Sequence, residues 1–261
     1  MDLGLTGKRA VVTGGSRGIG RAVAEALGAE GVDLHLVART RADLERTAEA
    51  IGIAHGVEVA VHALDLSDSA VIPDLLDETR DADILVNNAG AIPGGDLDTV
   101  DEATWRTAWD LKVFGFINMT RAYAQAMRAR GAGVIVNVTG LAGDKLDANY
   151  IAGSTGNAGL MAFTRAAGAY SLDHGVRILS VSPGPVETER IVSLMRTKAA
   201  DELGDAERWR EYLAKLPQGR CATPREVADV VVFLASDRAS FLSGTVVTVD
   251  GGHNARGGSF S

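Results

Sequence analysis

The chain has 261 residues, of which 46% are hydrophobic and 23% charged, and its formal net charge is −8. A chain of this length buries a substantial core, and a single α/β domain of this size is common. The acidic balance argues against nucleic acid or an anionic membrane as a partner, because either needs a basic face. The single cysteine, Cys221, excludes an intramolecular disulfide framework. No apolar run approaches the ~20 residues of a membrane span, and the first residues lack the features of a signal peptide. We therefore expect a cytoplasmic protein.

Short β-branched runs alternate with longer segments of helical period, which is the pattern of a parallel sheet with crossover helices. The predicted strands are Arg9–Thr13, Asp33–Ala38, Glu58–Ala63, Ile84–Val86, Gly133–Val138, Val176–Val181 and Thr245–Val249. The predicted helices are Ile19–Glu30, Arg41–Ile53, Ala70–Thr79, Glu102–Arg130, Ala148–Leu172 and Pro224–Ala235. We expect one α/β domain over residues 1–252, a doubly wound parallel sheet of about seven strands with helices on both faces, followed by a frayed tail at 253–261.

A glycine-rich loop joins the first predicted strand to the first helix. It reads Gly14, Gly15, Ser16, Arg17, Gly18, Ile19 and Gly20. Glycines let the backbone turn tightly and let a pyrophosphate approach the main chain, while the helix N-terminus supplies free N–H donors. The pattern alone also fits a flexible turn, but its place after a strand and before a helix favours a dinucleotide site.

The end of the second predicted strand bears on cofactor choice. An acidic side chain there hydrogen-bonds the free 2′-hydroxyl of NAD, but this chain has Ala38 followed by Arg39. Arg39 and Arg41, with Arg17 in the loop, form a cationic site suited to a 2′-phosphate. A solvated first turn of the next helix is the alternative. The residues favour NADP(H) over NAD(H).

Several further motifs occur in a fixed order: Asp65-Leu66, Asn87-Asn88-Ala89-Gly90, Tyr150, Pro183-Gly184-Pro185-Val186-Glu187-Thr188 and Val249-Asp250-Gly251-Gly252. With the glycine loop, they make the chain resemble the short-chain dehydrogenase/reductase family from about residue 5 to residue 252. The resemblance implies a Rossmann-type fold and the following contacts to the cofactor: Asp65 and Leu66 to the adenine, Asn87, Ala89 and Gly90 beside the ribose, and Val186 and Thr188, in the loop that begins with Pro183 and Gly184, to the nicotinamide carboxamide. Asn87 also has a structural interpretation, in which its amide bridges neighbouring strands. No metal site is predicted.

The catalytic set departs from that family. The resemblance implies Asn, Ser, Tyr and Lys at four places, where this chain has Lys112, Gly140, Tyr150 and Ser154. Hydride transfer to a carbonyl builds negative charge on oxygen, so the site needs a proton donor and a stabilising charge. Tyr150 is the expected proton donor or acceptor. The family's lysine, which lowers the pKa of that phenol, is missing.

Lys112 is a candidate for the missing cation. Ser154 follows Tyr150 by one helical turn, so both are expected on one face of a helix. We hypothesise that the Lys112 ammonium enters the vacated space while Ser154 keeps a hydroxyl near the ribose. In the alternative, Lys112 extends to solvent and the site has lost its cation. At Gly140, the preceding Thr139 is expected to face away, because adjacent strand side chains alternate, which leaves Asp144 or Lys145 as polar groups.

Residues 187–219 correspond to the family's substrate lid. Leu194, Met195, Trp209, Tyr212 and Leu213 give this segment an apolar side, and Arg190, Arg196, Lys198 and Arg210 give it a cationic side. A cover over an apolar ligand with an acidic end uses both, whereas core aromatics and a solvated charged face are the alternative. The small-residue helix after Tyr150 indicates close packing against another subunit, in a tetramer or dimer.

Two function classes follow from these residues. The first is an NADP-dependent oxidoreductase acting on a small-molecule carbonyl or secondary alcohol. The second is a nucleotide-binding relative without hydride transfer, serving as a non-redox enzyme or a regulatory binder. The intact glycine loop favours the first.

Overall fold

Seven parallel strands form one sheet in the computed structural model, which describes residues 1–256. Their order is β3-β2-β1-β4-β5-β6-β7. The strands are β1 (Arg9–Thr13), β2 (Asp33–Ala38), β3 (Val59–Ala63), β4 (Ile84–Asn87), β5 (Gly133–Val138), β6 (Val176–Pro183) and β7 (Val246–Val249). The order reverses between β1 and β4, and ligands bind at such a switch point in open α/β sheets. The predicted fold class is confirmed.

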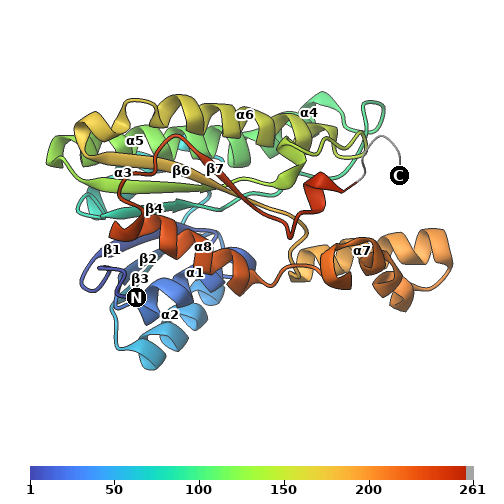
Figure 1. Ribbon diagram of the computed structural model, residues 1–261, viewed down its shortest axis with the longest axis horizontal. Coiled ribbons are helices and arrows are strands. Elements are labelled where there is room, and N and C mark those ends of the chain that lie inside the picture. Colours follow the sequence, from blue (N-terminus) through green and yellow to red (C-terminus); the bar gives the residue numbers. More distant parts are fainter. Residues whose placement is uncertain (257–261) are drawn as a thin grey trace.

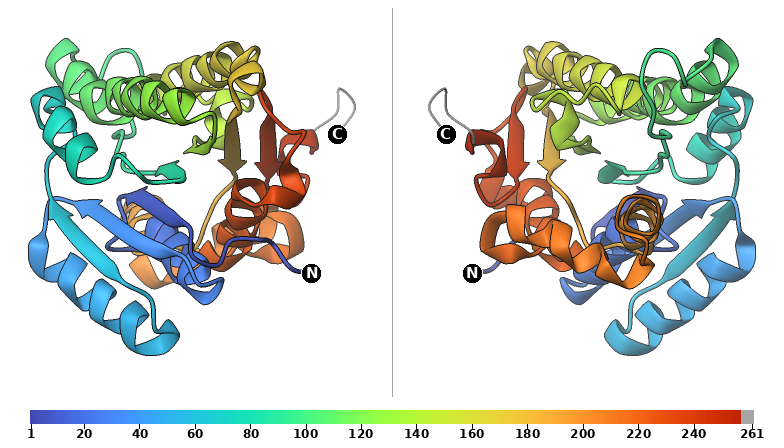
Figure 2. Two further views of the ribbon diagram at one scale, coloured as in Figure 1. Left: turned by 90° about the vertical axis from the view of Figure 1, so that its left-hand side faces the viewer. Right: turned by 90° about the vertical axis from the view of Figure 1, so that its right-hand side faces the viewer.

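Helices cover both faces of this sheet (Figure 1). They are α1 (Gly18–Ala29), α2 (Arg41–His55), α3 (Ile72–Glu78), α4 (Glu102–Trp109), α5 (Gly115–Arg130), α6 (Ile151–Gly168), α7 (Glu189–Leu203) and α8 (Pro224–Ala235). Figure 1 shows α1, α2 and α8 on one side of the sheet and α4, α5 and α6 on the other. Figure 2 shows the twist of the sheet between these layers.

The core follows from strand alternation. Val12 and Leu36 belong to a buried cluster with side chains of α1, α2 and α8, whereas Val11 and Val37 belong to a second cluster with side chains of α3 and α5. Because both faces are covered, the central strands are almost continuously apolar, as parallel sheets require. The strand ends are thereby held rigid, and the loops that follow them form the site.

Two of the predicted helices differ from the structure. The segment predicted as one helix over Glu102–Arg130 contains a π-helical turn, Asp110–Phe114, between α4 and α5. The helix predicted over Ala148–Leu172 is shorter, because α6 begins at Ile151 and ends at Gly168.

Contacts within this chain explain some of the glycines inside α6. A Cβ on Gly168 would lie 2.3 Å from Gly244 N, and one on Gly156 would lie 3.1 Å from Val113. Packing against another subunit stays a prediction.

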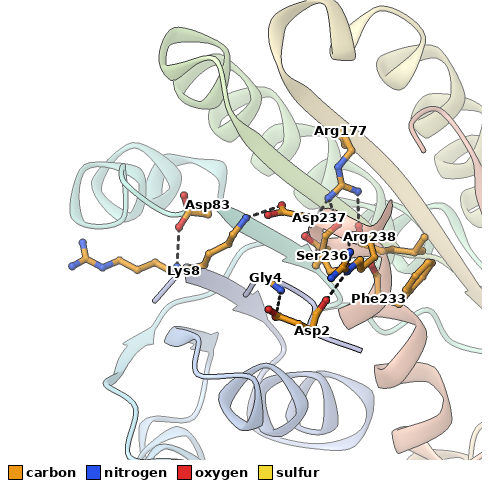
Figure 3. Close-up of polar contacts among 12 residues, drawn as sticks. Asp2, Gly4, Lys8, Asp83, Arg177, Phe233, Ser236, Asp237 and Arg238 are labelled. Atoms are coloured by element: carbon orange, nitrogen blue, oxygen red, sulfur yellow. Dashed lines mark hydrogen bonds and ion pairs between the residues drawn. The ribbon is translucent and has the colours of Figure 1, made fainter. Parts of the chain in front are cut away.

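A buried arginine joins the end of α8 to the sheet (Figure 3). The guanidinium of Arg177, in β6, donates to Leu234 O, to Ala235 O at 3.1 Å and to Ser236 O at 3.0 Å. Carbonyls in the last turn of a helix lack partners within the helix, so a cationic donor there satisfies them. Nearby, Lys8 Nζ contacts Asp237 Oδ1 at 2.9 Å and holds the N-terminal segment (Figure 3).

The predicted lid, residues 187–219, contains α7 and two 3-10 segments, Ala206–Lys215 and Pro217–Gly219. In Figure 1 it stands apart from both helical layers. The predicted tail begins with an ordered 3-10 turn, His253–Ala255, and residues 257–261 lie outside the described part. Over residues 1–256, no helix combines the length and apolarity needed to cross a membrane.

Candidate active site

The loop between β1 and α1 depends on its glycines. Gly14 and Gly18 have φ angles of 68° and 56°, a region that side chains other than glycine rarely adopt. A Cβ on Gly14 would lie 2.7 Å from Asn88 Nδ2, and one on Gly20 only 2.2 Å from Gly14 O. Asn88 Nδ2 in turn donates to Thr13 O at 3.1 Å. The loop is therefore packed against the end of β4, with room for its backbone to meet a ligand.

A groove of about 650 Å³ runs over this loop and the ends of β2, β3 and β4. Most of the predicted cofactor contacts line it: Gly14, Ser16, Arg17, Gly18, Ile19, Arg39, Asp65, Leu66, Ala89, Gly90 and Thr188. Gly20 and Asn87 do not. Asn87 Nδ2 instead donates to Thr120 Oγ1 at 3.1 Å and to Asn137 Oδ1 at 2.9 Å, which matches its structural interpretation as a bridge between β4 and β5.

The groove has both positively and negatively charged side chains in its lining. Arg17, directly before α1, and Arg39, directly after β2, both line it. Asp65 lies at the end of β3, where hydrogen bonds from Ser67 and, to a smaller extent, the charge of Arg39 lower the pKa of its carboxyl. Two arginines and one carboxylate with a lowered pKa therefore lie around this part of the groove.

A second cavity, of about 680 Å³, adjoins the groove. Five residues border both: Ile19, Asn88, Gly90, Thr188 and Arg190. The remaining wall comes mainly from the ends of β5 and β6, from α6 and the loop before it, and from the first turns of α7. Its residues include Lys112, Val138, Gly140, Lys145, Tyr150, Asn157, Pro183, Gly184, Val186, Leu194, Met195 and His253. A ligand lying along the groove therefore reaches a second chamber.

Lys112 lies in the π-helical turn and is only 9% exposed. Its Nζ donates to Val138 O at 2.7 Å and lies 4.2 Å from the centre of the Phe116 ring. Burial and, to a smaller extent, the positive charge of Arg190 lower the pKa of Lys112 to about 7. The side chain passes over Gly90, where a Cβ would lie 2.3 Å from Lys112 Cδ. π-helical turns are frequent at functional sites, and this one turns a lysine into the cavity.

Tyr150 precedes the first residue of α6, with φ −139° and ψ 44°, and is not itself helical. Its ring covers Gly153: a Cβ there would lie 2.0 Å from Tyr150 Cε1. Burial raises the pKa of the Tyr150 phenol, and the charge of Arg190 acts to lower it. The Lys112 ammonium donates to Val138 O rather than to this phenol.

Ser154 lies away from the cavity. Its Oγ accepts a hydrogen bond from Asp147 N at 3.0 Å and lies 3.3 Å from Asp147 O. The hydroxyl thus holds the loop before Tyr150 instead of lining the cavity as we expected. The difference has a local cause, because the one-turn rule applies only when both residues are helical, and Tyr150 is not.

Comparisons with known proteins agree with this geometry. Residues 14–254 match the family model described as enoyl-(acyl carrier protein) reductase. The chain is 34% identical to galactitol 2-dehydrogenase (L-tagatose-forming) of Cereibacter sphaeroides over 95% of this chain and 96% of that protein. It is also 34% identical to 3-oxoacyl-[acyl-carrier-protein] reductase of Vibrio harveyi, over 96% of this chain and 98% of that protein.

The chain belongs to the short-chain dehydrogenase/reductase family. Among solved structures, L-sorbose reductase from Gluconobacter frateurii, complexed with NADPH and L-sorbose, superposes with a TM-score of 0.91 at 31% identity, over 97% of this chain and 99% of that one. These relatives are oxidoreductases by name, and the fold matches that of L-sorbose reductase over 97% of this chain.

Within this family, the paired tyrosine and lysine stand four residues apart on one helical face. In the structure, Gly153 and Asn157 have that spacing within α6. Asn157 lines the cavity, and its Nδ2 donates to Gly153 O at 2.8 Å. The Tyr150 ring occupies the position of a side chain at Gly153. Asn157 is thus a cavity residue that the sequence analysis did not single out.

At the end of β5, Thr139 and Gly140 both border the cavity, so the expectation that Thr139 faces away holds only for its hydroxyl. Thr139 Oγ1 lies 2.9 Å from Ser180 Oγ, so its hydroxyl points toward the neighbouring strand. Gly140 has an extended backbone, and a Cβ there would lie 3.3 Å from both Nδ2 and Oδ1 of Asn157. Of the two polar candidates on the next loop, Lys145 lines the cavity, with its Nζ 3.0 Å from His253 O, whereas Asp144 does not.

Of the predicted lid, only the residues up to Met195, in the first turns of α7, line the cavity. Arg190, Ile191, Leu194 and Met195 line the cavity, and a guanidinium nitrogen of Arg190 donates to Ile92 O. Trp209 is buried, while Arg196 and Lys198 form solvent-exposed ion pairs with Glu207 and Glu202. The alternative of core aromatics and a solvated face therefore describes most of this segment.

Proposed function

We propose that the chain is an NADP(H)-dependent oxidoreductase that transfers a hydride between the nicotinamide and a carbonyl or secondary alcohol of a small molecule. The observation that carries this proposal is the junction of the groove with the second cavity, where Tyr150 and Lys112 lie. The glycine loop fits a dinucleotide, because the positive φ angles at Gly14 and Gly18 give the tight turn that lets a pyrophosphate approach the backbone. Related structures hold the same cofactor class, including L-sorbose reductase with NADPH.

Arg17 and Arg39 support NADP(H) over NAD(H). Both line the groove, and guanidinium groups suit a 2′-phosphate better than they suit a free hydroxyl. We expect the phosphates to lie on the N-terminus of α1 and the nicotinamide to border Val186 and Thr188. A homo-oligomer, tetramer or dimer, is part of the proposal.

Tyr150 is the proposed proton donor and acceptor. The nicotinamide, when bound, would supply a hydride. The Tyr150 phenol would give its proton to the carbonyl oxygen as negative charge develops there. Burial raises the pKa of this phenol, so the neutral, proton-donating form dominates at neutral pH. This state suits reduction of a carbonyl better than oxidation of an alcohol.

Lys112 is proposed to supply the positive charge that the missing lysine supplies elsewhere in the family. It lines the same cavity as Tyr150 and is buried. Because its pKa is about 7, the ammonium form dominates below that pH and the amine above it. Its contribution to a developing oxyanion therefore declines as the pH rises through 7.

Steady-state kinetics with NADPH and small ketones test the proposal. Tyr150→Phe should lower kcat by about 10²–10⁴-fold, the range of general acid–base catalysis. Tyr170→Phe is the matched control, because Tyr170 is 77% exposed. Turnover of ketones by Tyr150→Phe at the wild-type rate would remove the phenol from the mechanism.

Lys112→Met should reduce kcat most below pH 7, where the ammonium dominates, and should remove the decline in rate as the pH rises through 7. Lys112→Asn combined with Asn157→Lys should recover part of the rate. The structure puts the restored lysine at Asn157, because the Ser154 hydroxyl is bound to the loop at Asp147. A pH profile unchanged in folded Lys112→Met would show that this lysine is a bystander.

The second function, a nucleotide binder without hydride transfer, is favoured by one observation. No lysine follows Tyr150 by one turn, and burial raises the pKa of that phenol. Tight NADPH binding without turnover of any carbonyl or alcohol between pH 6 and 10 would support it.

A further inference from the structure

The second cavity differs in charge from the protein that surrounds it. The chain carries a formal net charge of −8. The cavity, in contrast, is lined by three cationic side chains and a single carboxylate, which are Lys112, Lys145, Arg190 and Asp147. Much of the remaining wall is apolar and includes Leu141, Leu194 and Met195. A cavity of this kind suits a ligand that has an apolar body and a negatively charged group.

The positive charge of the cavity is not compensated within residues 1–256. None of the three cationic side chains forms an ion pair there. Each donates instead to a backbone carbonyl, and the acceptors are Val138 O, His253 O and Ile92 O. A carbonyl orients a cation but leaves its charge in place. The carboxylate of Asp147 accepts from Asn149 N at 2.9 Å, in its own loop.

Lys145 differs in position from the other two cations. Arg190 borders the groove as well as the cavity, so a dinucleotide in the groove would compensate part of its charge. Lys112 is only 9% exposed and belongs to the proposed mechanism at Tyr150. Lys145 is half-buried, lies in the loop between β5 and α6, and borders the second cavity but not the groove. Its charge therefore faces the substrate and not the cofactor phosphates.

The residues around His253 hold Lys145 without neutralising it. Lys145 Nζ donates to His253 O at 3.0 Å, and an ammonium has further N–H groups to donate. Burial and, to a smaller extent, the charge of Lys145 lower the pKa of the His253 ring, so this ring is neutral at neutral pH. The nearby Asp250 carboxylate accepts from Gly252 N at 2.8 Å and from Asn254 N at 2.7 Å instead of pairing with the lysine.

We propose that Lys145 binds a carboxylate of the substrate, which makes the substrate an oxoacid in the reductive direction and a hydroxy acid in the oxidative direction. The inference rests on the proposed function, because the carbonyl of the same molecule is the group reduced beside Tyr150. A charge-assisted hydrogen bond from a half-buried ammonium is stronger than a bond between neutral groups. A carboxylate fits better than a phosphate, since one lysine and an apolar wall offer few donors for the several oxygens of a phosphate.

The experiment compares charged and neutral forms of one ketone. The probes are pyruvate, acetoacetate and levulinate, in which the carboxylate lies progressively farther from the ketone, each paired with its methyl ester. Lys145→Met removes the ammonium and keeps the unbranched stem, whereas Lys145→Arg keeps the charge. Lys198→Met is the matched control, because Lys198 lies outside the cavity lining and its side chain is 59% exposed.

The wild type should have a higher kcat/KM for one of the oxoacids than for its ester. Lys145→Met should lower this ratio by about 10–100-fold, because a hydrogen bond to a charged group is lost. Lys145→Arg should retain most of the ratio, and Lys198→Met all of it. The Kd for NADPH should be unchanged in all three variants, since Lys145 does not border the groove; this measurement also shows that the variants are folded.

Calorimetric titration of each oxoacid and its ester, into the free protein and into the NADP⁺ complex, makes the same comparison without turnover. A protein that reduces none of the ketones but loses affinity for the oxoacid in Lys145→Met keeps the carboxylate site and contradicts only the proposed function. The inference is overturned if the wild type favours no oxoacid over its ester in either measurement. A preference that folded Lys145→Met retains overturns it as well.

Discussion

Lys112→Met should change how the stability of the folded protein depends on pH. Lys112 is buried, and its pKa falls from the ordinary 10.5 to about 7 in the folded chain. The unfolded chain therefore binds more protons than the folded chain between these two pH values. The free energy of unfolding consequently rises with pH across this window, and below pH 7 the full penalty of the buried ammonium is present.

The size of the effect follows from the shift. Each pKa unit corresponds to about 1.4 kcal/mol, so the penalty at low pH is about 5 kcal/mol. Between pH 7.5 and 9.5, the free energy of unfolding should rise by up to about 3 kcal/mol through this one group. Methionine keeps the unbranched stem that packs near Gly90 and Phe116 but has no charge, so Lys112→Met should lack this rise.

Urea denaturation at pH 6.5, 7.5, 8.5 and 9.5 measures the difference between the two proteins. Subtracting the variant from the wild type removes the titration of the other groups, which both share. Lys198→Met is the matched control, since the Lys198 side chain is 59% exposed. Parallel pH curves for wild type and Lys112→Met would refute the assignment of a buried, titrating lysine.

Three further predictions concern other parts of the chain. Arg39→Asp should lower the preference for NADPH over NADH by about 10–100-fold, because a charge-assisted contact is lost; equal affinities in the wild type, measured by fluorescence titration, would contradict the cofactor assignment. Hydrogen exchange over residues 187–219 should slow on adding NADPH and a ketone, and uniform strong protection of the free protein would argue against a moving lid. Burial lowers the pKa of both His35 and His62, so the unfolded chain takes up protons first and stability should fall below about pH 6.5; an unchanged acid limb in His62→Asn would exclude that pair as its cause.

The sheet was predictable because its signal is simple. Buried parallel strands are short β-branched runs between turn residues, and β1, β2 and β5 have the predicted limits. The π-helical turn at Asp110–Phe114 was not predicted. One extra residue in a turn leaves the apolar spacing of a long helix almost unchanged, yet it determines that Lys112 faces the cavity.

The catalytic face was harder to predict, because it depends on where α6 begins. A four-residue spacing puts Tyr150 and Ser154 on one face only if the helix includes both, and α6 begins one residue after Tyr150. The signal that identifies Asn157 is its position one turn after Gly153 inside the helix. A glycine in a helix interior costs about 1 kcal/mol relative to alanine, which indicates that another group needs its space.

Three glycines of the site share one feature, since each lies beneath a polar side chain of the cavity. Gly90 makes room for Lys112, Gly140 for Asn157 and Gly153 for the Tyr150 ring, with distances from the missing Cβ of 2.3, 3.3 and 2.0 Å. Restoring one familiar side chain alone would displace the group that now fills its place. In the proposed mechanism these residues act as one rearranged set, in which the phenol comes from one turn upstream of Gly153 and the cation from the neighbouring π-helical turn. Independent losses from a decaying site would leave empty space or solvent at these glycines, whereas here each one is covered by a side chain with hydrogen-bonding or acid–base chemistry.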